Sequence, residues 1–223
     1  MRSFSRIPST GGGSAGQGYV AGQSKRLTSA TYFDANGIMR VAPPKALRPN
    51  YVYKNGVWVR DGWLREGQAQ NCLQCNDTSM GAYGAFPESY LIPQNGRPNY
   101  TPVYVPSDTQ VMVGSAYIFP SHPKTTATKL DMWWAGGGSD WTYVDLVNKV
   151  VVGTSTTWHI SCKNYGEALR VYLQGGPEHA TIWDPIFMPR YGDAVMACFQ
   201  NEVLTPDGNP TSWVPYGTTR AAD

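Results

Sequence analysis

The chain has 223 residues, of which 41% are hydrophobic and 15% are charged, and its formal net charge is +2. This apolar content excludes a wholly disordered chain and suffices for one substantial domain or two small ones. The near-neutral charge, without a cluster of lysine and arginine, argues against nucleic acid as the main partner.

The first segment, residues 1–26, contains the run STGGGSAGQG and has the composition of a flexible arm. Such an arm becomes ordered only when a partner surface or a neighbouring copy holds it, so we expect it to anchor the protein. The segment lacks the apolar core of a signal peptide, and no run is long enough to span a bilayer. We therefore expect synthesis in the cytoplasm and no membrane partner.

Two β-hairpins are predicted within residues 27–75. In YVYKNGVWVR, Asn55-Gly56 separates two runs in which apolar and polar residues alternate. In TYFDANGIMRV, Asn36-Gly37 has the same position. Asn-Gly favours the positive φ angles of a tight hairpin turn. The Gly- and Pro-rich residues 76–109 are predicted to be a connector.

Residues 110–223 contain many short β-type runs separated by turn residues. This spacing, without an amphipathic helix, predicts an all-β jelly roll or two-sheet β-sandwich. The predicted strands are VMVGSAYIF, KLDMWW, WTYVDLV, KVVVG, TTWHISC, ALRVYLQ, ATIWDPIF, AVMACF and NEVL.

Four cysteines raise the question of a metal or redox site. Cys72 and Cys75 form a C-x-x-C, which occurs in zinc half-sites and in redox pairs. A tetrahedral zinc site needs two further ligands, and no second pair follows at the required spacing. We therefore predict reduced thiols and no cofactor, with Cys162 and Cys198 as small core residues.

The ionisable residues do not form a recognisable catalytic pattern. His122, His159 and His179 are not at ligand spacing, and no serine lies in a G-x-S-x-G elbow. Nothing in the spacing of the aspartates selects a pair for glycoside hydrolysis. These aspartates are Asp131, Asp140, Asp145, Asp184 and Asp193. We predict that the chain is not an enzyme.

Three tryptophans flank a triple-glycine loop in DMWWAGGGSDW. Adjacent Trp133 and Trp134 must face opposite sides of a strand, so one of them points to the core and the other to a surface. The outer ring would serve an interface or a sugar, and we favour core or interface. A glycan site, if there is one, is predicted to use Trp134, Trp141, Asp131 and Asp140.

Residues 27–73 resemble a segment of tailed-phage virion proteins with the approximate pattern S-T-A-T-Y-x-D-x-x-G-x-L-x-T-A, P-R-x-x-Y and G-L-L-I-E-E-x-R-T-N-L. The matching residues are Ala30, Thr31, Tyr32, Asp34, Gly37, Ala42, Arg48, Pro49, Tyr51, Trp63, Leu64, Glu66, Gln70 and Asn71. Downstream, YVDLVNKVV and TTWHISC resemble the hairpin and strand of the jelly-roll module that follows in those proteins. The ending PTSWVPYGTTRAAD resembles their P-T-S-Y-I-P…T-R-A-A-D.

On these motifs the chain resembles the phage head spike or fibre-like family, which is related in shape to carbohydrate-binding modules. The resemblance implies a virion protein, either a capsid decoration or head-fibre subunit or a tail-associated subunit that binds host glycan. It implies the major capsid protein or another virion protein as partner, and we expect a homo-oligomer, a trimer. In longer relatives the T-R-A-A-D ending leads into a further domain. Because residues 218–223 contain no large apolar side chain, we expect them to be a tail or a joint that docks on a neighbour.

Overall fold

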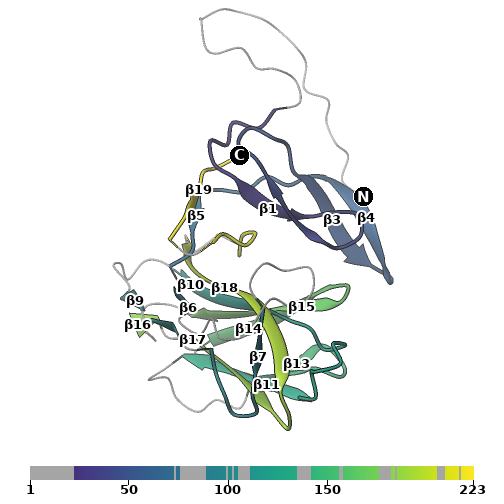
Figure 1. The fold of residues 1–223 in the computed structure, drawn as a ribbon. Helices are drawn as coiled ribbons and strands as arrows, with labels where there is room; N and C mark the ends of the chain where they lie inside the picture. The colour runs from purple at the N-terminus through teal and green to yellow at the C-terminus, as the bar shows by residue number, and fades with distance from the viewer. Residues whose placement is uncertain are drawn as a thin grey trace, which may run out of the picture.

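All regular elements in the described part of the chain are β-strands (Figure 1). The computed structural model describes residues 23–72, 74–75, 89–98, 100–101, 103–104, 111–134, 142–155, 158–175, 182–183, 185–204, 209–215 and 217–223. No helix in these ranges is long and apolar enough to cross a membrane. The predicted all-β class is confirmed.

Two antiparallel sheets form a jelly-roll-like sandwich. The five-stranded sheet has the order β14-β15-β10-β18-β7, with the bounds Trp158–Tyr165, Ala168–Gly175, Val111–Ile118, Ala194–Leu204 and Ser89–Ile92. The four-stranded sheet has the order β13-β12-β11-β17, with the bounds Val150–Val152, Tyr143–Asp145, Lys129–Trp134 and Pro185–Arg190. The predicted run KLDMWW coincides with β11, and AVMACF and NEVL are one continuous strand, β18.

The core of the sandwich comes from strands with alternating burial. In β11, Leu130, Met132 and Trp134 are buried while the residues between them are partly exposed. Successive side chains of a strand point to opposite faces, so these three pack against the facing sheet. Met112, Leu173 and Phe187 belong to the same apolar cluster. Fully burying one such side chain contributes about 1.5–3 kcal/mol.

The five-stranded sheet is covered on its other face as well. Tyr117 of β10 belongs to a second apolar cluster with Met39, Phe119 and Trp213, which come from outside the sandwich core. This second layer explains why nearly every residue of β10 is buried. A sheet buried on both faces has a continuous apolar run rather than an alternating one.

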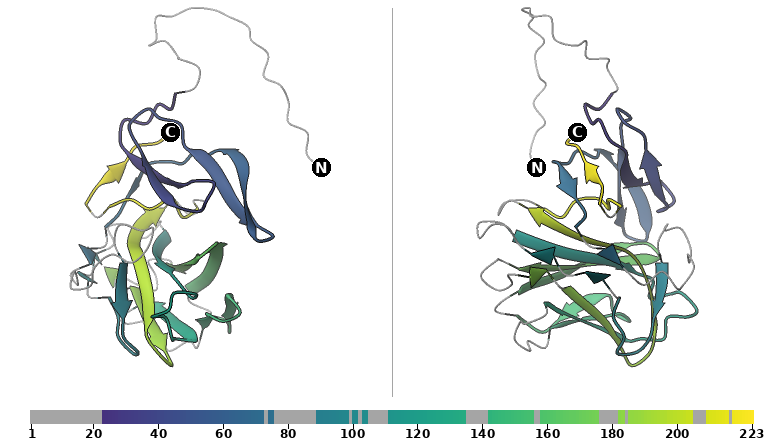
Figure 2. Two further views of the ribbon diagram at one scale, coloured as in Figure 1. Left: turned by 45° about the vertical axis from the view of Figure 1, so that its right-hand side comes forward. Right: turned by 60° about the vertical axis from the view of Figure 1, so that its left-hand side comes forward.

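The covering layer consists of two hairpins and the end of the chain (Figure 2). β1, Ala30–Phe33, pairs with β2, Met39–Ala42, and β3, Pro49–Lys54, pairs with β4, Val57–Trp63. Both predicted hairpins are confirmed, and Asn55, Gly56 and Gly37 have the positive φ angles that their turns require.

Three two-residue pairs complete the described strands. β5, Ala69–Gln70, pairs with β19, Thr219–Arg220, beside the hairpins (Figure 1). The other pairs are β6, Gln74–Cys75, with β8, Tyr100–Thr101, and β9, Val103–Tyr104, with β16, Ile182–Trp183. β7 lies within the predicted connector and forms an edge of the five-stranded sheet, since Ser89 to Ile92 pair with β18.

A β-bulge interrupts β18 where it pairs with β10. The register shifts between Ser115 and Tyr117, and Cys198 has a φ of 51°. A bulge inserts one extra residue into a strand and so exchanges the faces to which the following side chains point. Met196 before the bulge and Phe199 after it therefore both face the sandwich core.

Candidate functional site

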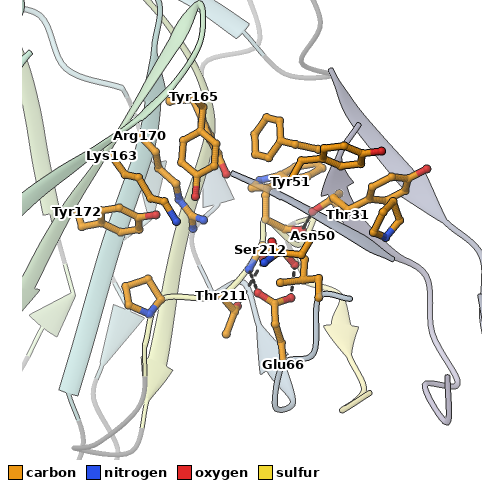
Figure 3. A pocket seen from close by; sticks show the side chains of 17 residues that line it. Thr31, Asn50, Tyr51, Glu66, Lys163, Tyr165, Arg170, Tyr172, Thr211 and Ser212 are labelled. Atoms are coloured by element: carbon orange, nitrogen blue, oxygen red, sulfur yellow. Dashed lines mark hydrogen bonds between the residues drawn. The ribbon is translucent and has the colours of Figure 1, made fainter. Parts of the chain in front are cut away.

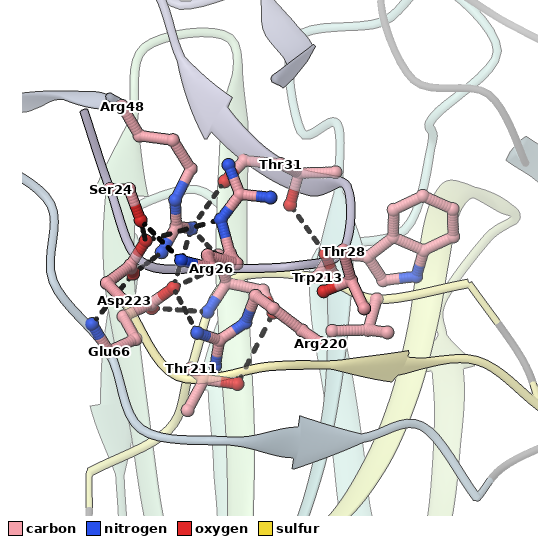
Figure 4. Close-up of polar contacts among 12 residues, drawn as sticks. Ser24, Arg26, Thr28, Thr31, Arg48, Glu66, Thr211, Trp213, Arg220 and Asp223 are labelled. Atoms are coloured by element: carbon pink, nitrogen blue, oxygen red, sulfur yellow. Dashed lines mark hydrogen bonds and ion pairs between the residues drawn. The ribbon is translucent and has the colours of Figure 1, made fainter. Parts of the chain in front are cut away.

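A buried network of charged side chains joins the hairpins to the end of the chain (Figure 4). The side chains of Arg26, Arg48 and Arg220 have no exposed surface. The side chains of Glu66 and Asp223 are 12% and 5% exposed. We call these five residues the latch.

Arg48 occupies the centre of the latch. Its Nη1 lies 2.9 Å from the carbonyl oxygen of Thr31 and 2.8 Å from Oε2 of Glu66. The same nitrogen lies 2.9 Å from Oγ of Ser212, and Nη2 donates to the carboxylate of Asp223. Hydrogen bonds between charged groups are roughly twice as strong as neutral ones. Arg48 therefore connects β1, the segment after β4 and the end of the chain.

Asp223 accepts hydrogen bonds from several segments. Its carboxylate lies 3.1 Å from Oγ of Ser24, 3.2 Å from Nε of Arg26 and 3.0 Å from the backbone nitrogen of Glu66. Burial alone would raise the pKa of this carboxyl, but the charge of Arg48 and these hydrogen bonds outweigh it and lower the pKa. Asp223 is therefore ionised at neutral pH.

The latch contains three arginines and two carboxylates, and the carboxylate of Glu202 balances the remaining positive charge. Arg220 Nη1 lies 3.3 Å from Oε2 of Glu66, and the negative charge of Glu202 also acts on Arg220. Glu202 accepts hydrogen bonds from the backbone nitrogen and hydroxyl of Thr211, at 2.9 and 2.7 Å. Three arginines thus face three carboxylates, which offsets part of the cost of removing each charge from water.

Asn71 extends the latch to the sandwich. Its Nδ2 donates to the carbonyl oxygens of Phe199 and Val214, at 3.1 and 2.9 Å. Its Oδ1 accepts from the backbone nitrogen of Asn201 at 3.1 Å. One side chain thus links the segment after β5, the central strand β18 and the end of the chain.

The structure of residues 218–223 differs from what their composition predicts. Residues 218–223 were expected to form a tail or joint without a core of their own. Instead Arg220 and Asp223 are buried in the latch, and β19 pairs with β5. The composition of this segment did not predict its burial, because its charged side chains are buried by pairing with other charged side chains. The end of the predicted arm is docked too, since Arg26 is buried and Gln23 bridges Ala46. Residues 1–22 lie outside the described residues.

A cavity of about 160 Å³ lies between the hairpins and the five-stranded sheet (Figure 3). We call it the tyrosine cavity, because five tyrosines are among its lining residues: Tyr32, Tyr51, Tyr117, Tyr165 and Tyr172. In Figure 3, Lys163, Arg170, Tyr165 and Tyr172 lie on one side, and Tyr51, Asn50 and Thr31 lie on the other. Glu66 of the latch borders the same cavity.

Arg170 is the buried cation of the tyrosine cavity. Its guanidinium carbon lies 5.1 Å from the ring centre of Tyr117 and 4.8 Å from that of Tyr172. Nη2 donates to Oγ of Ser115 at 3.1 Å, whereas Nε has no hydrogen-bond partner among the described residues. Lys163, which is exposed, lies over the ring of Tyr165 at 5.3 Å. Aromatic faces attract cations, so the tyrosines help to hold both charges.

A second cavity, of about 520 Å³, shares Tyr165 with the tyrosine cavity and is also lined by Asn36, Tyr53, Trp58 and Glu167. An aromatic stack borders both cavities. The ring of Phe33 lies 4.7 Å from that of Tyr165 and 5.5 Å from that of Trp58. This stack is an apolar contact between the hairpins and β14.

Of the residues predicted for a glycan site, the structure describes Asp131 and Trp134, which lie on opposite faces of β11. Trp134 is fully buried against Gly175, so its ring offers no face to a sugar. The carboxylate of Asp131 lies 2.6 Å from Nε of Arg190 and 2.9 Å from Nζ of Lys129. Trp141 and Asp140 lie outside the described residues. One of the adjacent Trp133 and Trp134 was expected to point to the core, and Trp134 does so. The glycan site itself stays a prediction.

The other candidates from the sequence are the cysteines and the histidines. Cys72, Cys162 and Cys198 are thiols, and the side chain of Cys75 lies outside the described residues. Within the described ranges, histidine, cysteine and acidic side chains do not gather into a group that could hold a metal ion. His159 points away from the core between the buried Trp158 and Ile160.

Sequence patterns do not identify the charged residues on which both sites depend. Arg48 and Glu66 were noted only as part of a resemblance, and Arg26, Lys163 and Arg170 were not singled out. One signal was available. Arg170 interrupts the apolar run ALRVYLQ, and a charge within a buried strand indicates a specific partner or a functional role.

No protein-family model matches this chain, and comparison with curated proteins found no relative.

Proposed function

We propose that this chain is a non-enzymatic structural subunit of a tailed-phage virion, a capsid decoration or head fibre or spike subunit. The observation that carries the proposal is the composition of the latch. Arg48 and Glu66 belong to the first phage-like motif, and Ser212, Arg220 and Asp223 belong to the last. Two distant motifs that form one buried network support a shared architectural origin.

We further propose that the chain assembles as a homotrimer on the major capsid protein or another virion protein. Apolar side chains on β2 and β4 support a contact surface, because Val41, Val57, Val59 and Trp63 are 66, 57, 44 and 49% exposed. Val57, Val59 and Trp63 share β4, and exposed apolar residues that lie together mark protein contacts. The residues before Gln23 would be the anchor.

Copy number per particle tests the proposal. Purified particles of the encoding phage are digested, and peptides of this chain are quantified against isotope-labelled standards and the major capsid protein. Hundreds of copies support shell decoration, and small multiples of three or six support a spike or tail location. Absence from particles contradicts the proposal. Removal of residues 1–22, which leaves the latch intact, should abolish incorporation without unfolding the chain.

A second candidate is a tail-associated subunit that binds host glycan, and the tyrosine cavity favours it. Aromatic rings with polar groups beside them are typical of small-ligand sites. Purified chain added to host cells should then block phage adsorption. Unchanged adsorption at saturating protein would contradict this candidate and would leave the structural proposal intact.

A further inference from the structure

Two cationic side chains, Lys163 and Arg170, line the tyrosine cavity. Among the described residues, neither Lys163 nor Arg170 forms an ion pair with an acidic side chain. Arg170 is 3% exposed and has an unused donor at Nε. A buried guanidinium without an anion is costly, and tyrosine rings compensate only in part.

The described acidic groups near the cavity are bound to other residues. The negative charge of Glu202 acts on Arg170, but its carboxylate accepts hydrogen bonds from Thr211 and forms no ion pair with Arg170 among the described contacts. Glu66 lines the cavity, but it is engaged by Arg48 and Arg220 and by both donors of Ser212. Burial raises the pKa of Tyr117, and burial likewise raises the pKa of Tyr172, so both are neutral phenols at physiological pH. The cavity is therefore suited to an anion.

The walls of the cavity also carry aromatic rings and a polar amide, which the binding of a simple inorganic anion would not require. The half-exposed rings of Tyr51 and Tyr165 lie on opposite sides (Figure 3). Asn50 adds an amide to the lining, whose Nδ2 also donates to the carbonyl oxygen of Asp61 at 3.2 Å. Flat rings with hydrogen-bonding groups nearby suit a sugar, because rings pack against its C–H face and polar groups orient its hydroxyls.

The size of the cavity limits its occupant. Its volume of about 160 Å³ is several times the ~30 Å³ that one water molecule occupies in the liquid. It is smaller than the roughly 300–1,000 Å³ of pockets that enclose drug-sized ligands. One sugar residue fits these limits better than an enclosed oligosaccharide.

We propose that the tyrosine cavity binds one carboxylate-bearing sugar residue of an acidic polysaccharide. The carboxylate pairs with Lys163 and Arg170, the sugar ring packs between Tyr51 and Tyr165, and Asn50 takes part in hydroxyl recognition. The inference deepens the second candidate function and rests on it. It assigns a ligand class and a location different from the tryptophan loop.

Binding of defined oligosaccharides to the purified full chain tests the inference. Trigalacturonate, its neutral counterpart galactotriose, and the acidic peptide triglutamate are titrated by calorimetry at low and physiological salt. Trigalacturonate should bind with a millimolar or lower Kd, about tenfold or more tighter than galactotriose, since a charged hydrogen bond distinguishes the two. Its affinity should fall as salt rises.

Two lysine variants locate the site. Lys163→Ala removes an exposed side chain and should weaken trigalacturonate binding about fivefold or more without lowering thermal stability. Lys129→Ala is the matched control, because Lys129 also lies over a tyrosine ring, that of Tyr143 at 4.0 Å, but outside the cavity. The control should bind within about twofold of the unmodified chain.

Four results would overturn the inference: equal affinity for the two trisaccharides, no trigalacturonate binding at millimolar concentration, equal effects of the two lysine variants, or triglutamate binding as tightly as trigalacturonate. The last result would assign the cavity to a protein carboxylate. The assay is independent of the adsorption test. A chain that blocks adsorption but ignores trigalacturonate keeps the glycan-binding function and loses only this inference.

Discussion

Arg48 and Asp223 lie 175 positions apart in the chain, and their side chains form an ion pair that is almost completely buried. The pair connects the first hairpin region to the last described residue. Because both charges are withdrawn from water, each needs the other. The stability of the whole covering layer should therefore depend on either residue.

Replacement of Asp223 by alanine tests this dependence. The change leaves Arg26 and Arg48 buried without their common acceptor, and removing one partner of a buried pair costs about 3–5 kcal/mol. Urea unfolding followed by circular dichroism should show this loss. Arg40→Ala is the control, because its partner Asp34 and Arg40 itself are partly exposed, and it should cost at most about 1 kcal/mol. Similar losses for both variants would contradict a special role for the latch.

The lowered pKa of Asp223 predicts an acid-sensitive latch. A carboxyl with a lower pKa in the folded state stabilises the fold above its unfolded pKa, near 3.8, and loses that contribution as the pH falls toward the folded value. Asp223 should contribute no pH dependence between pH 5 and 7. Below about pH 4 the unfolding free energy of the unmodified chain should fall more steeply than that of Asp223→Asn. Parallel pH profiles for the two proteins would refute the assignment.

The two hairpin turns offer a matched glycine comparison. Gly37 and Gly56 both have positive φ, at 74° and 82°, so alanine at either should cost about 1–2 kcal/mol in backbone strain. A Cβ at Gly37 would also overlap the indole of Trp58, whereas a Cβ at Gly56 meets nothing within 4 Å. Gly37→Ala should therefore cost about 1–3 kcal/mol more. In a Trp58→Ala background the excess should vanish, and its persistence would rule out the indole contact as the cause.

The aromatic stack should couple the hairpins to the sandwich. Phe33→Ala removes a ring that packs against both Tyr165 and Trp58 and should lower stability by about 2–3 kcal/mol, slightly less than a fully buried phenylalanine. Trp63→Ala is the control, since Trp63 is 49% exposed and its main contact is Arg60, at 4.3 Å, so it should cost about 1 kcal/mol or less. Equal losses of unfolding free energy in the two variants would mean that the stack does not anchor the hairpins.

The sequence predicts those parts of the fold that depend on neighbours in the chain. Asn55-Gly56 between alternating residues predicts a hairpin because turn chemistry is local, and alternation in KLDMWW predicts β11 for the same reason. The latch could not be predicted because Arg26 and Asp223 lie 197 positions apart, and no local sequence pattern near either residue identifies its partner. The tyrosine cavity escaped likewise, since it forms only when the hairpins cover β14 and β15.

The bulge at Cys198 divides β18 into two segments, in which different alternate positions face the sandwich core. Before it, even-numbered side chains such as Met196 face the sandwich core. After it, Phe199 faces the core, while Gln200 and Glu202 turn outward and bond to the backbone nitrogens of Val214 and Thr211. If β18 kept all its residues but alternated without the bulge, Gln200 and Glu202 would share the face of Met196 and point into the apolar interior. A one-codon insertion directly after Phe199 would produce this arrangement and detach the end of the chain from the sandwich. Deletion of Cys198 would instead leave Phe199 facing the core and both polar side chains facing outward.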